Sequence, residues 1–163
     1  MLRVRTCWRR HTASALAVLT VMLVARSVAA ADTMHFPAVE NVTSVLVDRI
    51  NAETVRIDVA AWYLSERALS IAIVNRFNAG VAVRLIGDRV AIFESDPFTR
   101  REFYWLASQG IPIRVRYEPT WFPQIVHWKA MVFAGQGVVA FGSANFTPFE
   151  LAPASSTNYK DET

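Results

Sequence analysis

The feature that most constrains the fold is a repeated switch from helical to strand periodicity between residues 38 and 117. Three segments with apolar residues at helical spacing are each followed by a segment in which apolar and polar residues alternate, as in a half-buried strand. The helical segments begin near residues 39, 66 and 97, and the strand segments cover 55–61, 81–86 and 111–117. Repeated alternation of this kind is typical of helices packed on a sheet. We therefore predict an α/β sandwich.

The same periodicity predicts which residues enter the core. Gly80 and Gly110 are placed to end the second and third helices, and Asp96-Pro97 is placed to open the third. The residues expected to face the core are Val39, Val42, Leu46 and Ile50 in the first helix, Leu69, Ala72, Ile73 and Phe77 in the second, Phe103, Leu106 and Ala107 in the third, and Ile111, Ile113, Val115 and Tyr117 in the last strand.

The pattern changes after residue 125, where two apolar runs, 126–133 and 138–144, flank the turn-like sequence Ala-Gly-Gln-Gly. This arrangement predicts a β-hairpin. If the turn is centred between Gly135 and Gln136, facing residues have numbers that add up to about 271. His127 would then lie near Ala144, and Lys129 near Gly142.

The first 31 residues predict a secretory signal peptide. Four arginines precede an apolar run from Ala13 to Ala25, and small residues follow up to Ala31. This order is typical of a cleaved leader, and the run is shorter than the roughly 20 apolar residues of a membrane span. We therefore expect a domain of residues 32–163 that is periplasmic or secreted.

Removal of this leader changes the charge and the cysteine content. It takes five arginines from the 17 basic residues, so that 12 remain against 14 acidic residues, and the net charge becomes −2. Broad binding of nucleic acid through overall positive charge is not favoured. Cys7 is the only cysteine, so the domain has no disulfide and no thiol nucleophile.

Polar side chains interrupt the predicted hairpin in two pairs. Residues two apart in a strand share a face, so His127 and Lys129 point in one direction, as do Ser143 and Asn145. Lysine supplies positive charge, asparagine an amide donor, serine a hydroxyl, and histidine a nitrogen that can attack phosphorus or move a proton. These groups suit a phosphate and require no metal or other cofactor.

These residues form two ordered motifs, His127-Trp128-Lys129 and Gly142-Ser143-Ala144-Asn145. The pair resembles the H-x-K and G-S-x-N signature of the phospholipase D superfamily. The resemblance implies a phospholipase D-like α-β-α sandwich with a mixed sheet, which represents one half of the usual two-motif architecture.

The resemblance also implies residue roles. His127 would be the nucleophile or acid in a reaction through a phosphohistidine, Lys129 and Asn145 would bind phosphate, and Ser143 would support them. A family carboxylate that orients the histidine would correspond to Glu162. The chain departs from the family at Ala134, where an aspartate, largely a structural partner, is usual.

The family completes its active site with two motifs, and this chain has one. The second histidine could come from a second copy in a homodimer, or from a missing second motif half of a longer protein. We expect a hydrolase of the phosphodiesterase class acting on phospholipids, hence lipid degradation. The alternatives are an exported endonuclease that acts as a homodimer and a catalytically incomplete fragment. Hydrolysis and transfer to an alcohol both remain open.

Overall fold

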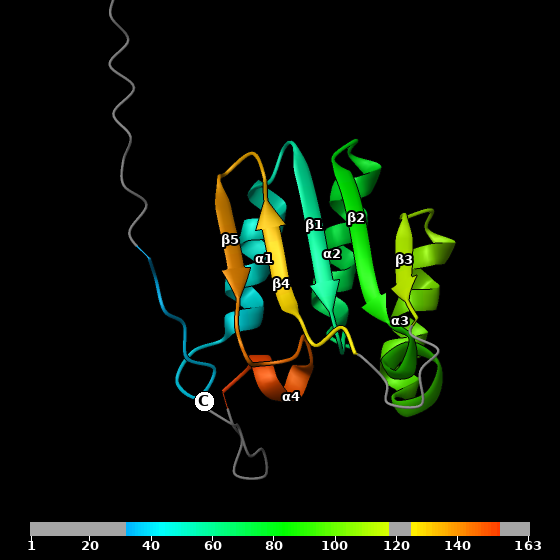
Figure 1. Ribbon diagram of the computed structural model, residues 1–163. Coiled ribbons are helices and arrows are strands. Elements are labelled where there is room, and N and C mark those ends of the chain that lie inside the picture. The colour runs from blue at the N-terminus through cyan, green and yellow to red at the C-terminus, as the bar shows by residue number, and fades with distance from the viewer. Residues whose placement is uncertain (1–31, 118–124, 154–163) are drawn as a thin grey trace, which may run out of the picture. The chain divides into compact units, whose positions relative to one another are not determined.

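A mixed sheet of five strands, in the order β3-β2-β1-β4-β5, forms the centre of the computed structural model, which describes residues 32–117 and 125–153 (Figure 1). The strands β1, β2 and β3 are parallel, whereas β4 is antiparallel to both β1 and β5. The elements are α1 (Val42–Ala52), β1 (Arg56–Ala61), α2 (Arg67–Asn78), β2 (Ala82–Asp88), the π-helical turn η1 (Ala91–Ser95), α3 (Pro97–Ser108), β3 (Ile113–Arg116), β4 (Lys129–Phe133), β5 (Val138–Phe141) and α4 (Pro148–Leu151). The predicted α/β class and mixed sheet are confirmed.

The helices start and stop where the local chemistry allows. Asn41 caps α1 by accepting from the Ser44 amide at 3.2 Å, and Asp96 caps α3 by accepting from the amides of the two residues that follow Pro97. Gly80 ends the second helix with a φ of 90°, a backbone conformation that glycine adopts without strain. The predicted helix boundaries therefore hold to within a few residues.

One side of the sheet carries the hydrophobic core. Alternate residues of β1 and β4, such as Val59 and Met131, are buried among helical side chains that include Ile50, Leu69 and Leu106. Helices α1, α2 and α3 all lie on this side, behind the sheet in Figure 1. Burial of a large aliphatic side chain contributes about 1.5–3 kcal/mol, so this single helix–sheet interface dominates the stability.

Four residues predicted for the core are exposed instead. Val39 lies in a turn before α1 and is 79% exposed, and Ala107 is on the outer side of α3. Val115 and Tyr117 are exposed because β3 is the last strand of the described sheet and only its first residues reach the helices. Two polar residues of α3, Thr99 and Glu102, are buried, whereas the apolar Ala107 is exposed.

The predicted hairpin register is confirmed, since Ala130 faces Phe141 and Phe133 faces Val138. Its strands are shorter than predicted, because β4 begins at Lys129 and β5 ends at Phe141. The motif residues His127, Ser143 and Asn145 thus lie beyond the strand ends, where the backbone is free to leave the regular ladder.

The predicted leader, residues 1–31, lies outside the described residues. Within the described ranges, none of the helices is both long enough and apolar enough to cross a membrane.

Candidate functional site

His127 and Lys129 are in contact at the start of β4. Lys129 Nζ lies 3.0 Å from His127 Nε2 and also donates to the backbone oxygen of His127 at 3.1 Å. His127 is exposed, whereas Lys129 is only 5% exposed. The buried ammonium of Lys129 is therefore in contact with the exposed imidazole of His127.

Trp62 forms the floor beneath this pair, and the sequence analysis did not single it out. Its ring centroid lies 4.4 Å from that of His127, with the planes at 58°, and 5.1 Å from Lys129 Nζ. Its backbone amide donates to the Trp128 oxygen at 3.0 Å, which extends the pairing of β1 with β4 past the last strand residues. The position of Trp62 directly after strand β1 could have indicated its role, because the sites of α/β proteins lie at the ends of strands.

The surroundings of Lys129 act on its charge in opposite directions. Burial lowers the pKa of Lys129 from its ordinary value, and the negative charge of Glu150 partly opposes that effect. The Trp62 ring adds a cation–π contact that favours the protonated form. The ammonium is thus desolvated but not neutralised by a direct ion pair within the described residues.

The loop that carries Ser143 and Asn145 is anchored through Phe146. The Phe146 oxygen accepts from the amides of Ser65 and Glu66 at 2.9 Å each, and its amide donates to the Tyr63 oxygen at 3.2 Å. The Phe146 side chain is 4% exposed and belongs to the core. This anchoring fixes the second motif against the segment that connects β1 to α2.

Asn145 is held by Glu150, which the sequence analysis also missed. The Glu150 carboxylate accepts from the Asn145 amide at 2.6 Å and from Asn145 Nδ2 at 3.0 and 3.1 Å. It also accepts from Thr147 Oγ1 at 3.3 Å. The Thr147-x-x-Glu150 spacing is that of a capping box, and this was the signal that could have identified the residue.

The predicted site residues are thus only partly brought together. Among the described residues, neither Ser143 nor Asn145 hydrogen-bonds to His127 or Lys129, and Ser143 is exposed. Glu162 lies outside the described residues. Trp128, between the two residues of the first motif, is 69% exposed. The two motifs are connected by the bond from the Gly142 amide to the Lys129 oxygen at 3.2 Å.

The turn that starts at Ala134 is ordered by a carboxylate from elsewhere in the chain. Glu53, at the end of α1, accepts from the amides of Gly135 at 2.8 Å and Gln136 at 3.3 Å. A Cβ atom on Gly135 would approach Glu53 Oε1 to 2.5 Å, so glycine permits this contact. The hairpin that presents Lys129 is therefore ordered despite Ala134.

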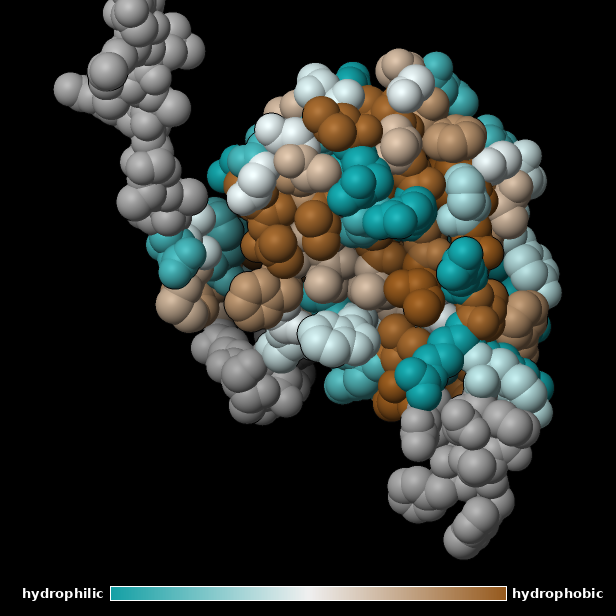
Figure 2. Space-filling model, turned by 45° about the horizontal axis from the view of Figure 1, so that its top comes forward, coloured by the Kyte–Doolittle hydropathy of each residue, from teal (hydrophilic) through white to brown (hydrophobic). Residues whose placement is uncertain are grey.

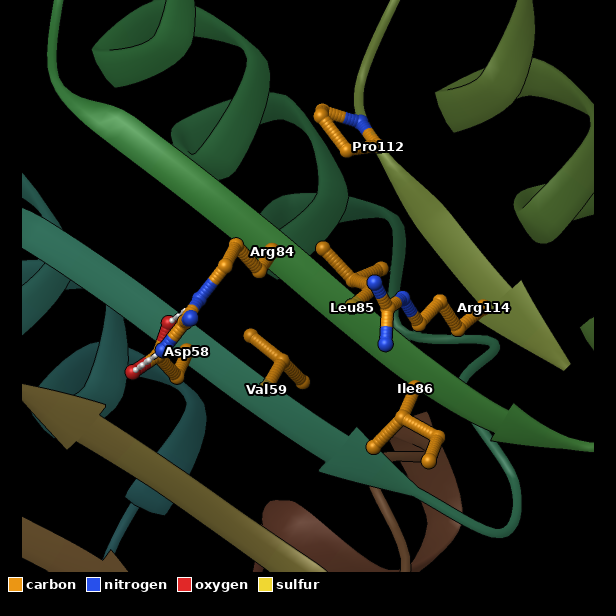
Figure 3. A pocket seen from close by; sticks show the side chains of 7 residues that line it. All are labelled: Asp58, Val59, Arg84, Leu85, Ile86, Pro112 and Arg114. Carbon is orange, nitrogen blue, oxygen red and sulfur yellow. Dashed lines mark hydrogen bonds and ion pairs between the residues drawn. The ribbon is translucent and has the colours of Figure 1, made fainter. Parts of the chain in front are cut away.

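A pocket of about 380 Å³ opens elsewhere, on the side of the sheet away from the helices (Figure 3). Asp58 and Arg84 meet on its wall, with guanidinium–carboxylate distances of 2.6 and 2.7 Å. The lining residues are Asp58, Val59, Arg84, Leu85, Ile86, Pro112 and Arg114. None of the motif residues lines it, so it is separate from the candidate site.

In residues 32–117 and 125–153, no group of three histidine, cysteine, aspartate or glutamate residues is placed to hold a metal ion.

The fold and the paired motifs define the class of protein. The chain belongs to the phospholipase D-like family, since residues 46–159 match the family described as "Cardiolipin synthase, PLD-like domain". Comparison with curated proteins gives no match.

Two solved structures show the same fold. One is a phospholipase D family member, Nuc from Salmonella typhimurium, with 24% identity and a TM-score of 0.55 over 64% of each chain. The other is NucT from Helicobacter pylori, with 17% identity and a TM-score of 0.50 over 64% of this chain and 66% of that one. The chain therefore spans just under two thirds of the length of either structure.

Proposed function

We propose that this chain carries one half of a phosphodiester-cleaving site, in which His127 attacks phosphorus while Lys129 and Asn145 bind phosphate oxygens. The supporting observation is the 3.0 Å contact between Lys129 Nζ and His127 Nε2. A protonated lysine has no lone pair, so Nε2 must accept and the ring proton must lie on Nδ1. The Nε2 lone pair is then held by the ammonium, and movement of Lys129 onto a phosphate oxygen would free it to attack phosphorus.

The reaction follows from this tautomer. His127 Nε2 forms a bond to phosphorus while the bond from phosphorus to the leaving oxygen breaks, and that oxygen takes a proton from a second histidine acting as general acid. Water then attacks phosphorus, the phosphorus–nitrogen bond breaks, and the second histidine takes the water proton. Lys129 and the Asn145 amide stabilise the charge on the phosphate oxygens in both steps.

The second histidine is proposed to come from outside this motif. His35 is the other histidine of the described residues, and its Nδ1 is engaged with Glu40 at 3.0 Å. No lysine follows it two residues later, because Pro37 occupies that position. A homodimer, or a second motif half in a longer protein, would supply the missing group.

The proposed substrate class is a phospholipid. Trp128 lies between His127 and Lys129 in sequence and is 69% exposed, and Phe149, next to Glu150, is 64% exposed. Amphipathic tryptophan and other aromatic side chains favour the boundary between lipid head groups and acyl chains. Together with the leader predicted for residues 1–31, these residues support an exported enzyme that acts at a membrane surface.

The test is hydrolysis by the chain from Asp32 onward, with its mass in solution measured by light scattering. We expect a dimer that hydrolyses bis(p-nitrophenyl) phosphate, and a loss of roughly a thousandfold or more in His127→Ala because the nucleophile is absent. His35→Ala is the matched control and should retain activity.

The substrate class is tested with the same preparation. Trp128→Ala should slow hydrolysis of phosphatidylglycerol vesicles about tenfold, which corresponds to about 1.4 kcal/mol of binding, with little effect on the small diester. Faster cleavage of a single-stranded oligonucleotide than of vesicles would instead identify a nuclease, because exposed tryptophan also stacks on bases. An inactive monomer would indicate an incomplete site.

A further inference from the structure

Glu150 satisfies three donors of the second motif at once. Its carboxylate accepts from the Asn145 backbone amide, from Asn145 Nδ2 and from Thr147 Oγ1, at distances between 2.6 and 3.3 Å. Glu150 lies in α4, which has only four residues, so these contacts rather than helix length determine where the carboxylate sits. The residue is partly buried, which strengthens each charge-assisted bond relative to one in water.

A carboxylate can only accept hydrogen bonds, and this fixes the orientation of the Asn145 carboxamide. The NH2 group must face Glu150, because the amide oxygen in that position would meet another acceptor. An NH2 group carries two hydrogens, so a phosphate oxygen can accept one of them while Glu150 holds the other. Asn145 Oδ1 is buried and has no hydrogen-bond partner among the described residues. No contact on the oxygen side therefore selects the orientation, and Glu150 alone distinguishes the two ends of the amide.

Glu150 also acts on the first motif through its charge. The groups that surround Lys129 Nζ are the His127 ring and backbone oxygen, the Trp62 ring and, at longer range, Glu150. Burial lowers the pKa of Lys129, and the Glu150 charge raises it. Glu150 is thus the described carboxylate that favours the protonated, phosphate-binding form of the lysine.

We propose that Glu150 is a positioning residue of the phosphate site, which orients the Asn145 carboxamide toward the position of a bound phosphate. The inference rests on the proposed function, because it assigns the Asn145 side chain to phosphate. The opposing effect is direct repulsion between Glu150 and the bound anion. If repulsion dominated, removal of the carboxylate would strengthen phosphate binding, so the sign of the effect decides between the two roles.

The test compares Glu150→Gln with the unsubstituted chain, with inorganic phosphate as the probe. Glutamine keeps the size but can present an amide NH2 to Asn145, which releases the orientation, and it removes the charge that supports Lys129. We expect phosphate to bind about tenfold more weakly, and the loss of binding at alkaline pH to begin at lower pH, as measured by calorimetry. Asp96→Asn is the matched control, since it removes a carboxylate that accepts backbone amides at the start of α3.

A spectroscopic measurement separates positioning from loss of fold. In NMR spectra, the Asn145 side-chain NH2 resonances should be displaced and slowly exchanging with Glu150 present, and should revert toward ordinary values in Glu150→Gln while other amide resonances are retained. Unchanged Asn145 resonances, or phosphate binding that is equal or tighter in the variant, would overturn the proposal. If the unsubstituted chain binds no phosphate, the proposed function fails, and the resonances still decide whether Glu150 orients Asn145.

Discussion

A single carboxylate joins two segments that are far apart in the chain. Glu53 is fully buried and accepts from the amides of Thr54, Val55 and Arg56, which lead into β1, and from those of the hairpin turn. Burial alone would raise the pKa of Glu53, but the backbone donors outweigh it and lower the pKa to about 2. The ionised form is therefore the one that the fold requires.

Glu53 should make stability depend on pH in the acid range. Because the folded-state pKa lies below the ordinary value of 4.5, its contribution is complete above that value and is lost as the pH falls toward 2. Glu53→Gln should lower the free energy of unfolding at pH 7 by about 2 kcal/mol and flatten the dependence between these limits. Urea unfolding monitored by circular dichroism at several pH values measures both effects. The control is Glu94→Gln, which changes an exposed carboxylate on η1 and should leave the pH dependence of stability intact. If Glu94→Gln flattened that dependence as much as Glu53→Gln, the assignment of the pH dependence to Glu53 would be wrong.

At the scale of elements, the packing of α3 against β2 depends on the absence of one side chain. A Cβ atom on Gly87 would lie 2.6 Å from Cε1 of Phe103 and 2.7 Å from Cδ1 of Ile92, both of which are buried. These distances are shorter than real contacts allow. The glycine in β2 thus sets how closely α3 and η1 approach the sheet.

Gly87→Ala should therefore destabilise the domain by about 1–3 kcal/mol, the usual cost of overpacking a core. Gly142→Ala is the matched control, because no atom lies within 4 Å of its added Cβ and its φ is not positive. Thermal unfolding should show a lowered midpoint for the first variant and little change for the second. Equal midpoints would mean that Phe103 and Ile92 move aside without cost.

At the scale of the whole described domain, the two sides of the sheet differ. The helices cover one side, while the other presents the Arg84–Asp58 ion pair (Figure 3). Figure 2 shows hydrophobic side chains interspersed with hydrophilic ones at the surface. The exposed apolar residues on the side without helices include Ile86, Val139 and Phe141, with Phe141 82% exposed. Parallel strands are usually covered on both sides, and exposed apolar surface of this kind favours association.

The isolated chain should therefore self-associate with rising concentration through the uncovered side of the sheet. Replacement of Val139 and Phe141 by threonine and serine should lower the mean mass measured by light scattering after size exclusion, without lowering the unfolding midpoint. Ile71→Thr, an exposed apolar residue on the outer side of α2, is the control and should leave the mass unchanged. If only the control lowered the mass, association would involve the helical side.

The sequence by itself determined the order of the helices and strands and the candidate site residues. Local periodicity, caps and turn residues gave the alternation of helices and strands and the hairpin register, because these depend on near neighbours in the chain. The two ordered motifs predicted His127, Lys129 and Asn145 as site residues.

Only the tertiary structure decided what surrounds those residues. The contact of Trp62 with His127 and the bonds of Glu53 to the hairpin turn join segments that are far apart in the sequence, and periodicity carries no information about such contacts. Glu150 is only five residues from Asn145, but the conformation of the chain between them decides that the two side chains meet. The exposure of Val115 and Trp128 was likewise decided by which strand lies at the sheet edge and which side the helices cover. An apolar residue in a strand is buried only where another layer packs on it.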